Sequence, residues 1–156
     1  MSEGFSIRLM EHRDAPVAAE ILVAYKSMSN YANRKICPQK LSLFICNTIE
    51  DDSRLGLAVE DEDGVVRGGF FGALVPNGVF EGSDAFEQGF ALDPVMREHT
   101  RPVIKAIISA FEHWAKEKGA LEVAYWISSG IPGRALEETF DETGYERIGY
   151  CARKEL

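Results

Sequence analysis

One short segment of the sequence combines two arginines with a threonine hydroxyl at the predicted start of a helix. It reads Arg97-Glu98-His99-Thr100-Arg101-Pro102. The first N–H groups of a helix have no partner within it and lie at the positive end of its dipole, so they can bind an anion. The two guanidinium groups would add charge-assisted hydrogen bonds to a pyrophosphate. A second interpretation stays open, in which both arginines lie in solvent at an ordinary helix entrance.

The helix that would position this segment has the clearest pattern in the chain. Its apolar stripe consists of Val103, Ile104, Ile107, Ile108, Phe111, Trp114 and Ala115, with Lys105, Glu112, Lys116 and Glu117 opposite. Gly119 predicts its end. A strand over Phe86–Leu92 precedes it and ends at Asp93-Pro94, because proline cannot donate to a sheet. The candidate anion site therefore lies between a strand and a helix.

In the rest of the chain, segments with the hydrophobic period of a strand alternate with segments that have the hydrophobic period of a helix. Strands are predicted over Ser6–Met10, Leu55–Val59, Val65–Val75, Leu121–Ile127 and Tyr145–Arg153, and helices from Asp14 as N-cap, from near Pro38, and over Gly133–Glu142. The acidic turn that ends in Gly64 predicts a hairpin. The order is β-α-α-β-β-β-α-β-α-β, which indicates one mixed α/β (α+β) domain over residues 1–156. The strands that flank the long helix should be parallel neighbours.

Composition excludes several classes of protein. With 25 acidic and 17 basic residues the formal net charge is −8, which argues against nucleic-acid binding. The sequence has no apolar run of the roughly 20 residues that span a membrane, and its first residues do not resemble a signal peptide. Its three cysteines form no CxxC pair and have no histidine at zinc-ligand spacing, so no metal site is predicted. We expect a cytoplasmic protein with reduced thiols.

The whole chain resembles the GNAT superfamily of acyl-CoA-dependent N-acyltransferases. Three segments carry the resemblance: Ile7-Arg8-Leu9-Met10-Glu11-His12-Arg13-Asp14, Ala91-Leu92-Asp93-Pro94-Val95-Met96-Arg97, and Ala135-Leu136-Glu137-Glu138-Thr139-Phe140-Asp141-Glu142-Thr143-Gly144-Tyr145. They are similar to the first strand and helix of the family, the entry to its cofactor loop, and its late helix. The resemblance implies a twisted sheet of six to seven strands, splayed beside the fourth and fifth, with helices on both faces.

The resemblance also implies site residues. Acetyl-CoA would be the co-substrate, with its pantetheine arm along the backbone of Phe90, Ala91 and Leu92. Its pyrophosphate would lie at Arg97, His99, Thr100 and Arg101. Glu87 is the best-placed candidate for the general base, acting directly or through water, although it also fits a solvated strand edge. The acceptor would be an amine of a small molecule or a peptide.

The sequence departs from the family pattern at the cofactor loop and at the residue that acts as the general acid. Thr100 and Pro102 stand where the loop of the family has glycines, and Phe140 stands where many members have the tyrosine that protonates the leaving thiolate. Two alternatives to a transferase therefore stay open. One is a catalytically inactive structural or interaction protein, for example one associated with a bacteriophage virion and found there or in the host cytoplasm. The other is an acyl-CoA binder without turnover. A homodimer through the final strand, around Ile148–Cys151, is a further expectation.

Overall fold

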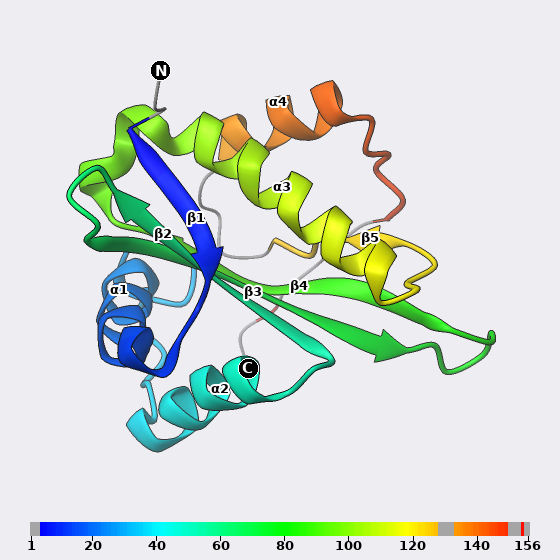
Figure 1. Cartoon of the computed structure of the whole chain (residues 1–156), viewed down its shortest axis with the longest axis horizontal. Coiled ribbons are helices and arrows are strands. Elements are labelled where there is room, and N and C mark those ends of the chain that lie inside the picture. Colours follow the sequence, from blue (N-terminus) through cyan, green and yellow to red (C-terminus); the bar gives the residue numbers. More distant parts are fainter. Residues whose placement is uncertain (1–3, 128–132, 150–153, 155–156) are drawn as a thin grey trace.

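A five-stranded mixed sheet forms the centre of the molecule (Figure 1). The computed structural model describes residues 4–127, 133–149 and 154. The strands lie side by side in chain order: β1 (Phe5–Leu9), β2 (Arg54–Asp61), β3 (Val66–Pro76), β4 (Ser83–Leu92) and β5 (Val123–Ala124). The first four are antiparallel, and β5 runs parallel to β4, as the strand-helix-strand order predicts.

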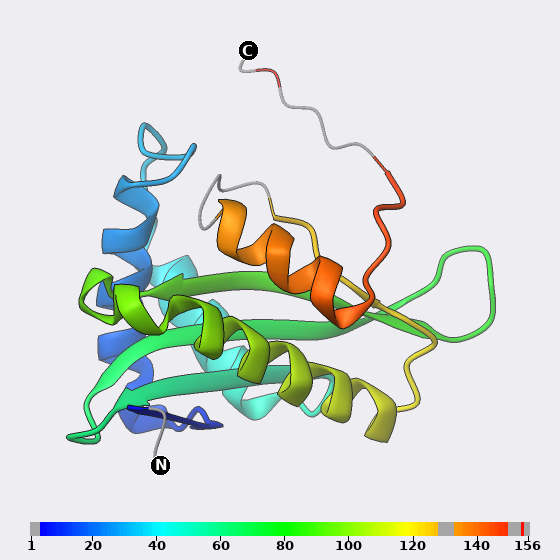
Figure 2. The same ribbon diagram turned by 90° about the horizontal axis from the view of Figure 1, so that it is seen from above.

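Helices cover both faces of this sheet, which confirms the expected layers. The helices α1 (Ala15–Ser27) and α2 (Pro38–Glu50) lie on one face, and α3 (Thr100–Glu117) and α4 (Gly133–Thr143) lie on the other (Figures 1 and 2). Two short 3₁₀ helices, η1 (His12–Asp14) and η2 (Pro94–His99), lead into α1 and α3. No helix in the described ranges is long and apolar enough to cross a bilayer.

The larger core lies between the sheet and α3. Val103, Ile107, Phe111 and Ala115 of the predicted α3 stripe are buried there, and the rings of Phe70 and Phe111 pack with their centroids 4.9 Å apart. Ile104 and Ile108 of the stripe pack instead with Leu136 of α4, and Trp114 is partly buried. Gly72 makes the contact between Phe70 and Phe111 possible, because a Cβ atom at that position would lie 2.5 Å from the Phe111 ring. A second core on the opposite face holds Phe71 and Ile45. The adjacent residues Phe70 and Phe71 therefore fill two different cores.

The first hairpin forms as predicted. The chain reverses between β2 and β3 at Gly64, whose φ of +75° a side chain would disfavour. The Asp61 carboxylate closes the turn by accepting the backbone N–H groups of Asp63 and Val65, at 3.1 and 2.9 Å. It also accepts a bond from Arg67 at 2.7 Å, which lowers the pKa of Asp61.

Asp14 precedes α1 as predicted, but its carboxylate does not cap that helix. It accepts two bonds from the Arg8 guanidinium, at 2.6 and 2.9 Å, and one from the backbone N–H of Glu11 at 2.8 Å. The ion pair with Arg8 holds the pKa of Asp14 below its usual range. Asp14 thus ties the start of α1 to strand β1, which is a tertiary role that a cap pattern cannot predict.

The sheet has fewer strands than the six to seven expected. The predicted strand Leu121–Ile127 is reduced to the two residues of β5. Residues 145–149 are not a strand. The Tyr145 side chain packs on α3, and its hydroxyl donates to Glu112 at 2.8 Å. Residues 150–153 of the predicted last strand lie outside the described residues, and these include two of the four residues of the expected dimer edge; Ile148 itself is exposed.

Candidate functional site

Strands β4 and β5 part soon after they meet. Their pairing consists of Ala85 with Val123 and Phe86 with Ala124. Beyond these pairs, the β4 edge from Glu87 to Leu92 has no sheet partner on the side of β5 within the described residues. This is the splay that the sequence resemblance implies. Its backbone N–H and C=O groups can pair with an extended ligand.

A bulge in β4 sets which side chains face the splay. Opposite β4, Phe71 pairs with Gly89 and Gly72 pairs with Glu87, so Gln88 has no partner on β3. The extra residue shifts the alternation of the strand by one position. Glu87 and Phe90, which a regular strand would place on opposite faces, therefore face the same side and line one cavity with Ile104 and Ile108.

Glu87 is the titratable group of this cavity. It is half-buried, and its carboxylate accepts a hydrogen bond from the backbone of Trp126, the second residue after β5. Burial raises the pKa of Glu87 from its ordinary 4.5 to about 7, because the charged form loses solvent; the bond from Trp126 opposes this rise. A carboxylate with a pKa near the working pH suits general-base catalysis.

The cavity itself is small and apolar apart from Glu87 and Tyr125. Its volume is about 20 Å³, and Phe70, Ile107, Ile127 and Leu136 complete the lining. The polar atoms of Glu87 and Tyr125 are not exposed in the cavity, so it lacks the polar partners that a buried water needs. The volume does not fit a pantetheine arm until neighbouring side chains move.

The predicted pantetheine segment keeps its open backbone. Phe90, Ala91 and Leu92 pair with β3 on one side only, and Ala91 and Leu92 are buried. The Phe90 ring lies edge-on to Tyr25 of α1, with centroids 6.5 Å apart, and also lines the cavity. Helix α1 thus reaches the splay from the opposite face of the sheet.

Most backbone donors of the predicted pyrophosphate segment are engaged. Residues 94–99 form the 3₁₀ helix η2, in which N–H groups bond to the third residue before them. The Thr100 N–H bonds to the carbonyl of Arg97, and Pro102 has none to donate. The Asp93 carboxylate accepts the N–H of Val95 at 3.0 Å. Side chains must therefore supply most of any anion binding here.

The side chains of this segment point to different partners. Arg101 forms ion pairs with Glu138, at 3.5 Å, and with Glu142, both on α4. His99 packs against Phe5 of β1, with ring centroids 6.2 Å apart, and the Thr100 hydroxyl donates to the carbonyl of Arg97 at 2.9 Å. Arg97 is exposed and has no ion pair among the described residues. Of the four predicted residues, Arg97 is the one whose charge is available.

An aromatic cluster surrounds Phe140, the residue at the tyrosine position of the late helix. The Tyr125 and Tyr145 rings lie 4.9 and 5.1 Å from it, centroid to centroid. The Tyr125 hydroxyl is buried and has no hydrogen-bond partner among the described residues. Burial raises the pKa of both tyrosines, which makes each a weaker proton donor. Ser128 and Ser129, which follow the predicted strand Leu121–Ile127, lie outside the described residues.

Sequence reasoning missed two contributors to this site. Trp126 binds Glu87 through its backbone, so its residue type carries no signal of the role. Tyr125 lies in a predicted strand, and only the alternation of that strand suggested which face it takes. The Gln88 bulge could have been inferred only from the interruption of alternation between Ala85 and Leu92.

Comparison with solved structures identifies the fold. The structure of AAC(6')-Iy in complex with the bisubstrate analogue CoA-S-monomethyl-acetylneamine is similar over 97% of this chain and 99% of that one, with a TM-score of 0.69 and 19% identity. Glucosamine-6-phosphate N-acetyltransferase from Arabidopsis thaliana covers 97% of both chains, with a TM-score of 0.72 and 13% identity. A transcriptional regulator from Bacillus halodurans C-125 covers 97% and 99%, with a TM-score of 0.76 and 11% identity.

These likenesses confirm the expected acetyltransferase fold. Comparison of the sequence alone, with family models and with curated proteins, gives no match. Because a transcriptional regulator shares the fold with the transferases, the fold does not by itself assign an activity. The function has to be argued from the residues of the site.

Proposed function

We propose that this chain, which has the fold of the GNAT superfamily, transfers an acetyl group from acetyl-CoA to an amine. One observation carries the proposal: Glu87, with a pKa raised to about 7, lies where β4 parts from β5. The open backbone edge of β4 and the unpaired charge of Arg97 support binding of the co-substrate beside it. The fold alone is shared with other functions, so Glu87 supplies the chemical argument.

The reaction would need one base and one polarising group. Glu87, directly or through water, would take a proton from the acceptor amine. The nitrogen would then attack the thioester carbon, and a backbone N–H of the open β4 edge would stabilise the charge on the carbonyl oxygen. The C–S bond breaks as the N–C bond forms, and the CoA thiolate takes up a proton. The raised pKa of Tyr125 and Tyr145 favours water over either hydroxyl as the source of that proton.

A second candidate function is supported by a separate observation. The cavity beside Glu87 holds about 20 Å³, and most donors at the start of α3 are engaged. Both features would follow if the fold were kept for binding a partner while turnover was lost. The two candidates differ in whether acetyl-CoA binds and whether CoA is released.

The test combines thermal unfolding with an assay of CoA release. Acetyl-CoA at 100 times its dissociation constant would add about 2.7 kcal/mol to the free energy of unfolding, which raises Tm by roughly 5 °C for a domain of this size. Arg97→Ala should reduce that shift. Glu87→Gln keeps the shape of the side chain, so it should preserve the shift and abolish release of CoA thiol in the presence of a panel of amines. A blank without acceptor is needed, because the exposed Cys37 reacts with thiol reagents.

Each result separates the candidates. A shift in Tm with Glu87-dependent turnover supports the transferase. A shift without turnover by any amine of the panel supports an acyl-CoA binder. The absence of any shift in Tm contradicts both the transferase and the acyl-CoA binder, and favours the second candidate, a structural or interaction protein.

A further inference from the structure

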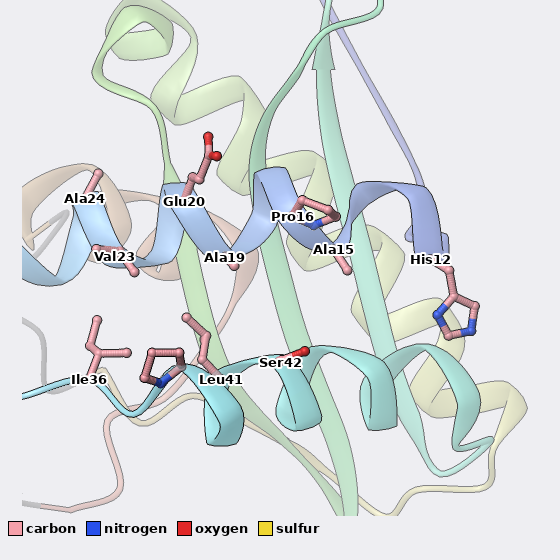
Figure 3. Close-up of a pocket in the computed structure, with 11 residues that line it drawn as sticks. His12, Ala15, Pro16, Ala19, Glu20, Val23, Ala24, Ile36, Leu41 and Ser42 are labelled. Atoms are coloured by element: carbon pink, nitrogen blue, oxygen red, sulfur yellow. The ribbon is translucent and has the colours of Figure 1, made fainter.

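A groove runs between α1 and α2, on the face of the sheet opposite α3 (Figure 3). We call it the α1–α2 groove; it has a volume of about 610 Å³ and is lined by His12, Ala15, Pro16, Ala19, Glu20, Val23, Ala24, Ile36, Pro38, Leu41 and Ser42. Ligand sites for small molecules usually have volumes of about 300–1,000 Å³. The groove is therefore of the size that holds a small molecule, whereas the cavity beside Glu87 is not.

The walls of the groove are mostly apolar, with the Ser42 hydroxyl in the middle (Figure 3). Ala19 and Val23 of α1 point toward α2, and Leu41 of α2 points back toward α1 (Figure 3). The two ionisable residues of the lining are peripheral: Glu20 points away from α2, and His12 lies at one end (Figure 3). His12 is also paired with Glu50 at 3.3 Å. This interior suits an alkyl chain, whose burial is favourable by about 0.8 kcal/mol per methylene.

The groove lies in the basic part of an acidic protein. Residues 15–50, from the start of α1 to the end of α2, contain four basic residues, Lys26, Arg34, Lys35 and Lys40, against two acids, Glu20 and Glu50. The whole chain has 17 basic against 25 acidic residues. A local excess of positive charge in such a chain attracts an anion that the rest of the molecule repels.

These four cations are not neutralised within the described structure. None forms an ion pair with a carboxylate among the described residues, whereas Arg8, Arg67 and Arg101 all do. Arg34 lies over the Tyr31 ring at 5.0 Å, and Lys26 donates to the carbonyl of Ala32 at 2.6 Å. The side chains of Lys35 and Lys40 are exposed.

Two of the four cations are sequence neighbours of residues that line the groove. Lys35 directly precedes Ile36, and Lys40 directly precedes Leu41, both of which line the groove. Ile36 lies across from Val23 and Ala24, at the opposite end from His12 (Figure 3). An apolar channel with positive charge at one end complements a molecule with an apolar tail and a single anionic head. A membrane surface would instead call for cations along the whole rim of the groove.

We propose that the α1–α2 groove binds a single-chain anionic amphiphile, with the alkyl chain between the helices and the anionic head at Lys35 and Lys40. This inference does not rest on the proposed transferase function, because the groove and Glu87 lie on opposite faces of the sheet. An effect of the amphiphile on the acetyl site is not required.

The experiment measures binding of monomeric dodecanoate to the full chain by calorimetry, at a concentration below micelle formation. Dodecyltrimethylammonium has the same chain length and the opposite charge, and is the matched ligand control. We expect saturable binding of dodecanoate that weakens with added salt, and none of the cation. Vesicles of phosphatidylglycerol form a third arm. Binding to vesicles without binding to monomeric dodecanoate would overturn the proposal in favour of a membrane surface.

Variants locate the site. Lys35→Glu with Lys40→Glu should weaken dodecanoate binding by about tenfold or more, and Val23→Trp should block it by filling the groove from an exposed position. Lys116→Glu reverses an exposed charge on α3 and should leave the affinity within about twofold. Circular dichroism checks that each variant folds. No saturable binding, equal binding of the cation, or an affinity that neither groove variant changes would each overturn the proposal.

Discussion

At the scale of single residues, the place of Glu87 in the site and its pKa have different origins. The family resemblance of the sequence was enough to select it as a candidate base. Its raised pKa comes from burial among tertiary neighbours that no local pattern contains, namely the bulge at Gln88 and the α3 side chains of the cavity, and the Trp126 backbone bond opposes it. Asp14 shows the same limit, because its partner Arg8 lies on another element.

The raised pKa of Glu87 predicts a pH-dependent stability. Between its ordinary pKa of 4.5 and the folded value of about 7, the folded chain binds more protons than the unfolded chain at this site. The contribution of Glu87 to the free energy of unfolding therefore decreases as pH rises through that window. One pKa unit corresponds to about 1.4 kcal/mol, so the full change is on the order of 3 kcal/mol or less for a half-buried group.

Glu87→Gln removes this titration and supplies the comparison. Urea unfolding of both proteins between about pH 5 and pH 8 should show the variant gaining stability relative to the parent as pH rises. If the protein is a transferase, kcat/KM of the parent should increase over the same range as the base ionises. A stability difference that stays constant with pH would show that Glu87 ionises at an ordinary value.

At the scale of elements, the bulge in β4 links the core to the site. Ala85, Glu87, Phe90 and Leu92 pair with Leu74, Gly72, Phe70 and Gly68 of β3, which all face α3. The four β4 residues share this face only because Gln88 is an extra residue. The hydrophobic period predicted the long helix and the turn residues predicted the hairpin, because each of these elements is determined by residues close together in the sequence. The bulge and the loss of the last strand depend on contacts between elements, such as the bond from Tyr145 to Glu112.

Two deletions in β4 test this interpretation. Deleting Gln88 should leave a regular strand with Phe90 and Leu92 on the core face, so the protein should stay folded with a loss of about 1–2 kcal/mol. Deleting Ala91, which lies beyond the bulge, should instead turn either Phe90 or Leu92 away from the core and should destabilise the protein much more. Ala91→Gly is the control for the lost side chain. Similar thermal unfolding curves for the two deletions would contradict the assigned register.

At the scale of the whole molecule, α4 closes the splay from the α3 side. Leu136 packs on Ile104 and Ile108 beside the Glu87 cavity (Figure 2 shows α4 along α3). Two sets of ion pairs hold α4 there, from Arg101 to Glu138 and Glu142 and from Lys105 to Glu142 at 2.7 Å. The carboxylates of α4 thus form ion pairs with Arg101, one of the arginines at which the sequence predicts a pyrophosphate.

If acetyl-CoA binds with its pyrophosphate at Arg101, the ion pairs from Arg101 to Glu138 and Glu142 must break. The double variant Glu138→Gln with Glu142→Gln replaces both carboxylates with amides and should release Arg101. Because exposed ion pairs contribute about 0.2–1 kcal/mol each, its affinity for acetyl-CoA should be about three- to tenfold higher. Glu137→Gln is the matched control, because Glu137 pairs with Arg147 rather than with α3. Hydrogen exchange in residues 133–143 should become faster when the parent binds acetyl-CoA. Tighter binding in the double variant, with no change in the control, would show that α4 competes with the phosphates for Arg101. Equal affinities in all three proteins would mean that the co-substrate uses Arg97 alone, and that the ion pairs of α4 serve only to hold the helix on the core.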